Sequence, residues 1–141
     1  MTDQTANWQD VCILAARWVL GAVFVLAVSF KIMGFGAIVE LISTAGFPFA
    51  SVLAALAVAF EIAIVVALFT GAFLPELMLA GCVYVVFLAF AFHGPSHWID
   101  PKGLEFGAFI NHFPFAAALL LAAGHGPGRL LAFRRSLLTR Q

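Results

Sequence analysis

Two ionisable side chains of opposite charge interrupt the apolar stretches of this sequence. Glu61 lies near the middle of an otherwise uncharged run from about Ser51 to Ala72, and Lys31 lies near the end of the preceding run. A charge at the centre of a membrane helix costs about 2.5–3.5 kcal/mol, so such a residue marks a functional site or a structural ion pair. Glu61 is therefore the first candidate for proton chemistry. Lys31 is its expected partner, and Arg17 is the competing one.

Three further polar side chains fall within or at the ends of the later apolar runs. His93 closes the third run, and Asn111 and His112 lie one to two turns into the fourth. Imidazole exchanges protons near physiological pH, and amides donate hydrogen bonds to carbonyl groups. We expect these residues to form one outward-facing polar pocket, with Glu61 and His93 in catalytic proton transfer and Lys31, Asn111 and His112 in ligand binding. The alternative is that the histidines are interfacial residues wetted by headgroup water.

Composition indicates the class of protein that carries these residues. The chain has 141 residues, of which 64% are hydrophobic and 10% are charged. A soluble domain carries roughly 25% charged residues, so this chain has too few polar side chains to cover a water-facing surface. Seven Lys and Arg residues balance seven Asp and Glu residues, and no basic stripe precedes the C-terminal tail. Nucleic acid is therefore not an expected partner, and an integral membrane protein in a lipid bilayer is expected.

Four apolar runs are long enough to cross a bilayer, which takes roughly 17–25 helical residues. They cover about residues 11–35, 51–72, 77–93 and 106–123. Backbone polar groups in lipid must be paired within their own segment, so each run is predicted to be an α-helix. A short interfacial helix is expected at about residues 37–44. The predicted fold class is all-α: an integral membrane four-helix bundle in one transmembrane domain over residues 1–141, with a basic interfacial tail at 124–141.

Basic residues predict how the chain is oriented in the membrane. Four crossings place both termini on one side, together with Arg17 and four arginines of the tail. The opposite side holds only Lys31 and Lys102. The positive-inside rule then places both termini in the cytoplasm, for a multi-pass protein of the cell (inner) membrane. In this arrangement Arg17 is expected to bind lipid phosphate at the cytoplasmic surface.

No metal site is predicted, although His93 and His97 have the spacing of two ligands on one helix face. Gly94 and Pro95 lie between them and break the helix. The chain also contains no haem or iron–sulfur ligand set, so no covalently bound cofactor is expected.

The order of several short motifs resembles the DoxX family of small four-span membrane proteins. The resemblance covers roughly Ala15 to Arg129 and rests on these positions, in chain order: Arg17, Gly21, Phe24, Lys31, the AGFP stretch Ala45 to Pro48, Glu61, Gly71, His93, Asn111 and the GPGR stretch Gly126 to Arg129. It implies a four-helix membrane bundle. It also implies a link to redox complexes, because the family is named after a subunit of an archaeal thiosulfate:quinone oxidoreductase and other members are associated with oxidative-stress complexes.

Two hypotheses of function follow from this resemblance. In the first, the chain is a membrane subunit of a redox complex that holds a quinone or a similar lipid-like carrier, and a partner protein supplies the electrons. It would then be at most one subunit of an oxidoreductase. In the second, it is a non-catalytic anchor or assembly subunit, and Lys31 and Glu61 only fix the register of two helices. A transporter is disfavoured because four spans lack the usual paired repeats.

Overall fold

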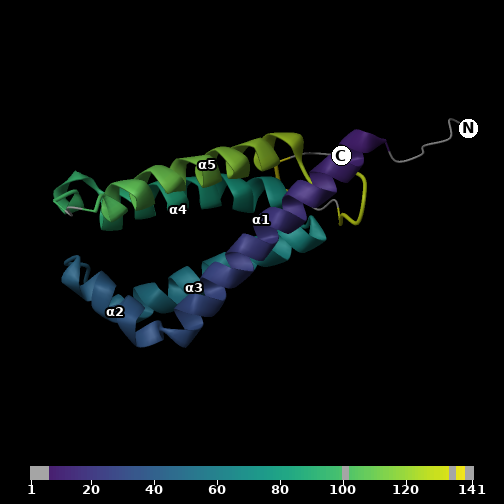
Figure 1. The fold of residues 1–141 in the computed structure, drawn as a ribbon. Coiled ribbons are helices and arrows are strands. Elements are labelled where there is room, and N and C mark those ends of the chain that lie inside the picture. Colours follow the sequence, from purple (N-terminus) through teal and green to yellow (C-terminus); the bar gives the residue numbers. More distant parts are fainter. Residues whose placement is uncertain (1–6, 100–101, 134–135, 139–141) are drawn as a thin grey trace, which may run out of the picture.

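The computed structural model describes residues 7–99, 102–133 and 136–138 (Figure 1). Within these ranges the chain forms four long helices, a short helix and a 3-10 turn. They are α1 (Trp8–Met33), α2 (Phe35–Thr44), α3 (Ala50–Thr70), α4 (Leu74–His93), η1 (Pro95–His97) and α5 (Leu104–His125). The long helices α1, α3, α4 and α5 are each apolar and long enough to cross a membrane. The all-α prediction, with a short helix between the first two spans, is confirmed.

The helices begin a few residues before the apolar runs, and in α1 a local cap explains the extension. At the start of α1, Asn7 and Asp10 form a capping box, in which each side chain accepts a hydrogen bond from the other's backbone N–H. This pairing satisfies two N–H groups that a helix start leaves free, so the helix includes polar residues before Val11. Pro75 lies in the first turn of α4, where its missing N–H costs nothing.

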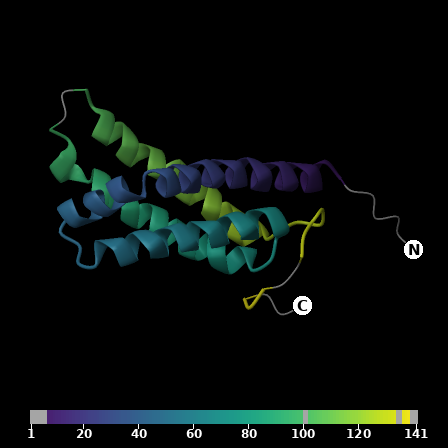
Figure 2. The ribbon, with the colours of Figure 1, turned by 90° about the horizontal axis from the view of Figure 1, so that it is seen from below.

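The helices form two layers that diverge along the molecule (Figure 1). The first layer contains α1, α2 and α3, and the second contains α4 and α5. Contacts are most extensive between α4 and α5 and between α1 and α3, and α3 also packs on α4. The start of α1, the α3–α4 turn and the end of α5 lie at one end of the molecule, here called the termini end (Figures 1 and 2). The opposite end, which holds α2 and η1, is here called the loop end.

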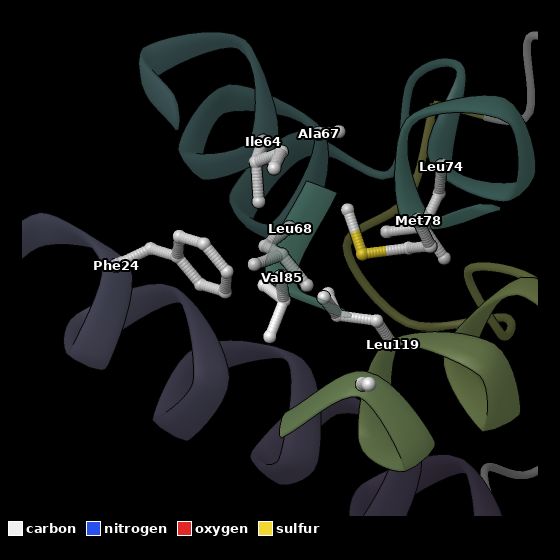
Figure 3. Packing of buried hydrophobic residues seen from close by; sticks show 9 residues of the cluster. Phe24, Ile64, Ala67, Leu68, Leu74, Met78, Val85 and Leu119 are labelled. Atoms are coloured by element: carbon white, nitrogen blue, oxygen red, sulfur yellow. The ribbon is translucent and has the colours of Figure 1, made fainter. Parts of the chain in front are cut away.

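The buried core joins the two layers in the half of the molecule nearer the termini end. Ile64 and Leu68 of α3 meet Met78 of α4 and Leu119 of α5, and all four side chains are fully buried (Figure 3). Gly81 allows this approach, because a Cβ atom there would lie 3.0 Å from Ile64 Cδ1. The core therefore holds the middle of α3 and α4 in fixed register, which is where the candidate site is found.

The segment after α5 folds back across the termini end of the bundle. The N–H of Phe133 donates to the carbonyl of Thr70 at 2.7 Å, and the Ser136 hydroxyl donates to Glu76 Oε1 at 2.7 Å. The described part of the tail is thus attached to α3 and α4. Three of the four predicted tail arginines, Arg134, Arg135 and Arg140, lie outside the described residues.

Candidate functional site

A buried carboxylate with two donors lies at the centre of the molecule. Lys31 Nζ is 2.5 Å from Glu61 Oε1, and the Tyr84 hydroxyl donates to the same oxygen at 2.7 Å. The Glu61 side chain is 2% exposed and that of Lys31 is 21% exposed. The three residues come from α1, α3 and α4, so the site bridges both layers. The predicted pairing of Glu61 with Lys31, rather than with Arg17, is confirmed.

The direction of helix side chains explains how Lys31 reaches Glu61 from near the end of α1. Every Cα–Cβ bond in a helix tilts towards that helix's N-terminus. Since α1 and α3 run antiparallel, the side chains of Lys31 and Glu61 lean towards each other. The structure therefore combines an α1 that begins before Val11, at Trp8, with the Lys31–Glu61 ion pair.

The second carboxylate oxygen of Glu61 is left open. Glu61 Oε2 is buried and has no hydrogen-bond partner within the described part of the chain. A buried charged oxygen without a partner is unfavourable, and such an atom is a recognised sign of an unfilled polar contact. The arrangement can therefore hold a negative charge on one oxygen and accept a proton or a hydrogen bond at the other.

An apolar pocket of about 400 Å³ adjoins this site from the loop end. Tyr84 is its polar member, and the remaining lining comes from α2, α3, α4 and the loop before α3: Ile42, Phe47, Leu53, Leu56, Ala57, Phe60, Phe87, Leu88 and Phe92. The ring of Phe60 packs edge-on against Tyr84 at 5.2 Å and so fixes the direction of the hydroxyl. The volume lies in the range of small-molecule sites, roughly 300–1,000 Å³, and the lining suits a flat hydrophobic ring.

A second polar group lies at the loop end, on α4 and α5. His93 Nδ1 is 2.8 Å from Glu105 Oε2, and the rings of His93 and His112 lie 5.2 Å apart. His112 Nδ1 is also 2.7 Å from the carbonyl of Ala108 in its own helix. Both partners of the His93–Glu105 pair are partly exposed. This group is thus a partly exposed pair of an imidazole and a carboxylate, with a second imidazole beside it.

The structure therefore divides the predicted pocket into two groups. Lys31 and Glu61 belong to the central site, and His93 and His112 belong to the loop-end group. Nine residues separate Tyr84 from His93 on α4, or about 13 Å along the helix axis. Asn111 belongs to neither group, because its side chain is exposed on α5. The prediction of one shared pocket is wrong because the two layers diverge where these residues lie. The roles of the residues remain predictions.

Arg17 is not a lipid-phosphate anchor, and that prediction is wrong. Its side chain is 2% exposed, and all five guanidinium N–H groups donate to backbone carbonyls. The acceptors belong to the end of α3 and to the tail: Leu68 at 2.9 Å, Phe69 at 3.1 Å, Pro127 at 2.7 Å, Leu130 at 3.3 Å and Leu131 at 3.2 Å. A helix C-terminus leaves its last carbonyls free and carries negative partial charge, so a cation satisfies both needs.

Sequence reasoning missed Tyr84 and Glu105 as members of the two groups. For Tyr84 the sequence favours core packing, although a tyrosine hydroxyl in the middle of an apolar run could also donate a hydrogen bond. The hydroxyl group was the available signal for Tyr84, because Glu61 in the preceding apolar run is a hydrogen-bond acceptor. Glu105 gave no signal, because an acidic residue in the first turn of a helix is ordinary.

Comparison with protein families identifies the class of protein that this fold and site define. Residues 12–94, more than half of the chain, match the sequence model of the DoxX family. The matched range contains Lys31, Glu61, Tyr84 and His93. The chain therefore belongs to the DoxX family and is a multi-pass membrane protein. Comparisons with curated proteins and with solved structures gave no match.

Proposed function

We propose that this DoxX protein is the membrane subunit of a redox complex and that it holds a quinone-like carrier in the pocket beside Tyr84. One observation carries the proposal: Tyr84, the polar member of an otherwise aromatic and aliphatic pocket, is hydrogen-bonded to a buried carboxylate that has one open oxygen. A lipid-soluble ring with carbonyl or hydroxyl groups matches both parts of that environment. A bound quinone would supply two-electron, two-proton chemistry.

The residues of the chain would bind the carrier and handle its protons. The hydroxyl proton of Tyr84 goes to Glu61, so the Tyr84 oxygen would accept a hydrogen bond from a hydroxyl of the reduced carrier, and Glu61 would hold the proton to be transferred. Lys31 keeps the charge of Glu61 compensated while that proton is absent. His93 and Glu105, which are partly exposed, would exchange protons with the aqueous side. Of these residues only Tyr84 lines the pocket, so direct binding of the carrier is assigned to Tyr84, and Glu61 acts through its hydrogen bond with that hydroxyl.

Partners and location belong to the same proposal. A partner protein would supply electrons, since the sequence has no recognisable ligand set for haem or for an iron–sulfur cluster. The excess of arginines in the sequence that follows the fourth span supports a cytoplasmic location of both termini in the cell membrane. A cytoplasmic electron donor would then bind at the termini end, and a donor outside the cell membrane would bind at the loop end.

A second candidate function is that of an anchor or assembly subunit. It is favoured by the position of the Lys31–Glu61 pair between α1 and α3, because a buried ion pair fixes the register of two helices without any chemistry. Under this hypothesis the complex assembles poorly without the pair, but each assembled complex works normally.

Co-purification from native membranes in a mild detergent tests the proposal. We expect a redox protein in stoichiometric amount and extractable quinone. Recovery of the chain alone, without quinone, would contradict the proposal.

The Glu61→Gln variant then separates the two functions, with Glu40→Gln as the matched control at an exposed acid of α2. A carrier-binding role predicts normal assembly and lost turnover for Glu61→Gln, and normal values for both in the control. Lower yield of the complex with unchanged turnover per complex would favour the assembly role instead.

A further inference from the structure

An amide side chain is exposed on α5 within the depth of the membrane. Asn111 lies two turns beyond Leu104, about 10 Å along the axis of a helix that is roughly 33 Å long. Its side chain is exposed, and it makes no hydrogen bond within the described part of the chain. The hydrocarbon region offers no water to such a group, so a protein partner is needed to satisfy it.

A proline one turn further on adds a second polar group to the same part of α5. Pro114 lies inside the helix and has no N–H, so the carbonyl of Ile110 loses its usual partner. Ile110 is 45% exposed. A side-chain amide and a backbone carbonyl that lacks its usual helical partner thus belong to neighbouring residues of one helix.

These groups lie on a regular stripe that is open to a neighbouring helix. The spacing alternates between four and three residues, as in the contact seam of two packed helices. The upper part is narrow, because a Cβ atom at Gly107 would meet nothing within 4 Å. The lower part lines an apolar groove of about 690 Å³ that α5 shares with α1. We call this the α5 stripe, and it consists of Gly107, Asn111, Pro114, Ala118 and Leu121.

We propose that a second copy of this chain packs against the α5 stripe and that the Asn111 side chains of the two copies hydrogen-bond to each other. Copies inserted in the same orientation are related by a two-fold axis along the membrane normal, which places equal residues at equal depth. An amide is both donor and acceptor, so two copies of Asn111 satisfy each other. Small residues such as Gly107 and Ala118 allow the backbones to approach closely.

Disulfide cross-linking in native membranes tests the contact. In a chain carrying Cys12→Ser and Cys82→Ser, Asn111→Cys is oxidised with copper phenanthroline. We expect a product of about 30 kDa, twice the 15.1 kDa of one chain. Phe113→Cys is the matched control, since Phe113 is also exposed but lies about 200° around the helix. A product formed equally by both variants, no product, or a product containing a different protein would overturn the proposal.

A second measurement keeps both native cysteines. Mass measurement in mild detergent compares the wild-type chain with Asn111→Leu and Asn111→Gln. Leu suits lipid and helix, so the fold is not at risk. We expect roughly 3- to 30-fold weaker self-association for Asn111→Leu and near wild-type association for Asn111→Gln. A wild-type chain that is monomeric, or a Leu variant that associates as well as wild type, would refute the contact. Neither result depends on carrier binding.

Discussion

Glu61 is stabilised on one side only, and this asymmetry governs how its neighbours respond to change. Both donors, Lys31 and Tyr84, bind Oε1, while Oε2 stays buried without a partner in the described structure. Removal of one member of a buried ion pair leaves an uncompensated charge, whereas replacement of both members by apolar residues is often neutral. Stability and chemistry can therefore be separated experimentally at this site.

For Lys31→Met we expect a loss of about 3–5 kcal/mol in the free energy of unfolding, because the Glu61 charge stays buried without a cation. The double variant Lys31→Met with Glu61→Leu should regain most of that stability while lacking any carrier-linked activity. Unfolding in detergent, followed by circular dichroism, checks both. A double variant as unstable as the single one would show that the pair does not act as a unit.

For Tyr84→Phe we expect a loss of about 1.5–3 kcal/mol, the usual range for a hydrogen bond to a charged group. The ring contact with Phe60 is retained in this variant, so the pocket keeps its shape. If the carrier binds as proposed, co-purified quinone should also fall. Unchanged quinone content together with the expected loss of stability would assign Tyr84 to structure alone.

The sequence predicted the Lys31–Glu61 pair because a charged side chain in an apolar run has few possible partners of opposite charge. It did not predict the inclusion of Tyr84, since a tyrosine among apolar residues is also compatible with core packing. Arg17 was misassigned for a different reason. A cation near the end of a span usually meets lipid phosphate, and here a tail with no helical or strand pattern covers it. Burial of a side chain by a distant, irregular segment of the chain leaves no periodic pattern in the sequence.

The turns between the helices depend on particular backbone conformations and close contacts. Gly71 ends α3 at φ 79°, and a Cβ atom there would lie 2.9 Å from Pro127 Cβ and 3.0 Å from Ala132 Cβ. Gly46 has a similar φ of 84°, but a Cβ atom at that position would meet nothing within 4 Å. A comparison of substitutions at the two glycines therefore distinguishes the cost of backbone strain from the cost of overlap with the tail.

We expect Gly46→Ala to cost about 1–2 kcal/mol, the strain of a left-handed residue with a Cβ atom. Gly71→Ala should cost distinctly more, because the same strain is joined by overlap with the tail. Thermal unfolding of the two variants in one detergent gives the comparison. Equal costs would mean that the tail yields freely at Gly71.

Arg17 ties the tail to α3, and its five donors set the strength of that attachment. Lysine offers at most three donors from one point, so Arg17→Lys leaves at least two of the carbonyls unpaired. We expect the tail to detach more often and trypsin to cleave after Arg129 at least several-fold faster than in the wild type. Time-resolved proteolysis read by mass spectrometry measures this rate. An unchanged rate would mean that the other contacts of the tail, with Glu76, Thr70 and Asp10, suffice to hold it.

The helices themselves were largely predictable, because length and hydropathy dictate them in lipid. Their ends were less so. The start of α1 depends on the reciprocal bonds of Asn7 and Asp10, which lie before the apolar run. Phe49 and Phe73 adopt left-handed conformations just before α3 and α4, at positions where propensity favours glycine or asparagine. Tertiary packing decides such positions.

At the scale of the whole molecule, orientation decides which compartment each polar group faces. With both termini in the cytoplasm, η1 and the His93–Glu105 group lie on the outer side. In a chain lacking native cysteines, we expect Ser96→Cys to react with a membrane-impermeant maleimide added outside intact cells. Leu138→Cys should react only after the cells are opened. The reverse pattern would place the termini outside and invert the proposed proton path.

The Arg17 contacts have a mechanical consequence for the two layers. Directional hydrogen bonds hold α1, α3 and the segment after α5 together at the termini end. At the loop end, the ring contacts of Phe47 with Phe87 and Phe92 join the layers, and such contacts slide at little cost. We therefore expect relative tilting of the layers to pivot about the termini end, with the Glu61–Tyr84 hydrogen bond between the layers limiting its extent. Over a lever arm of about 30 Å, a tilt of roughly 5° displaces the loop end by about 3 Å, close to the thickness of one aromatic ring.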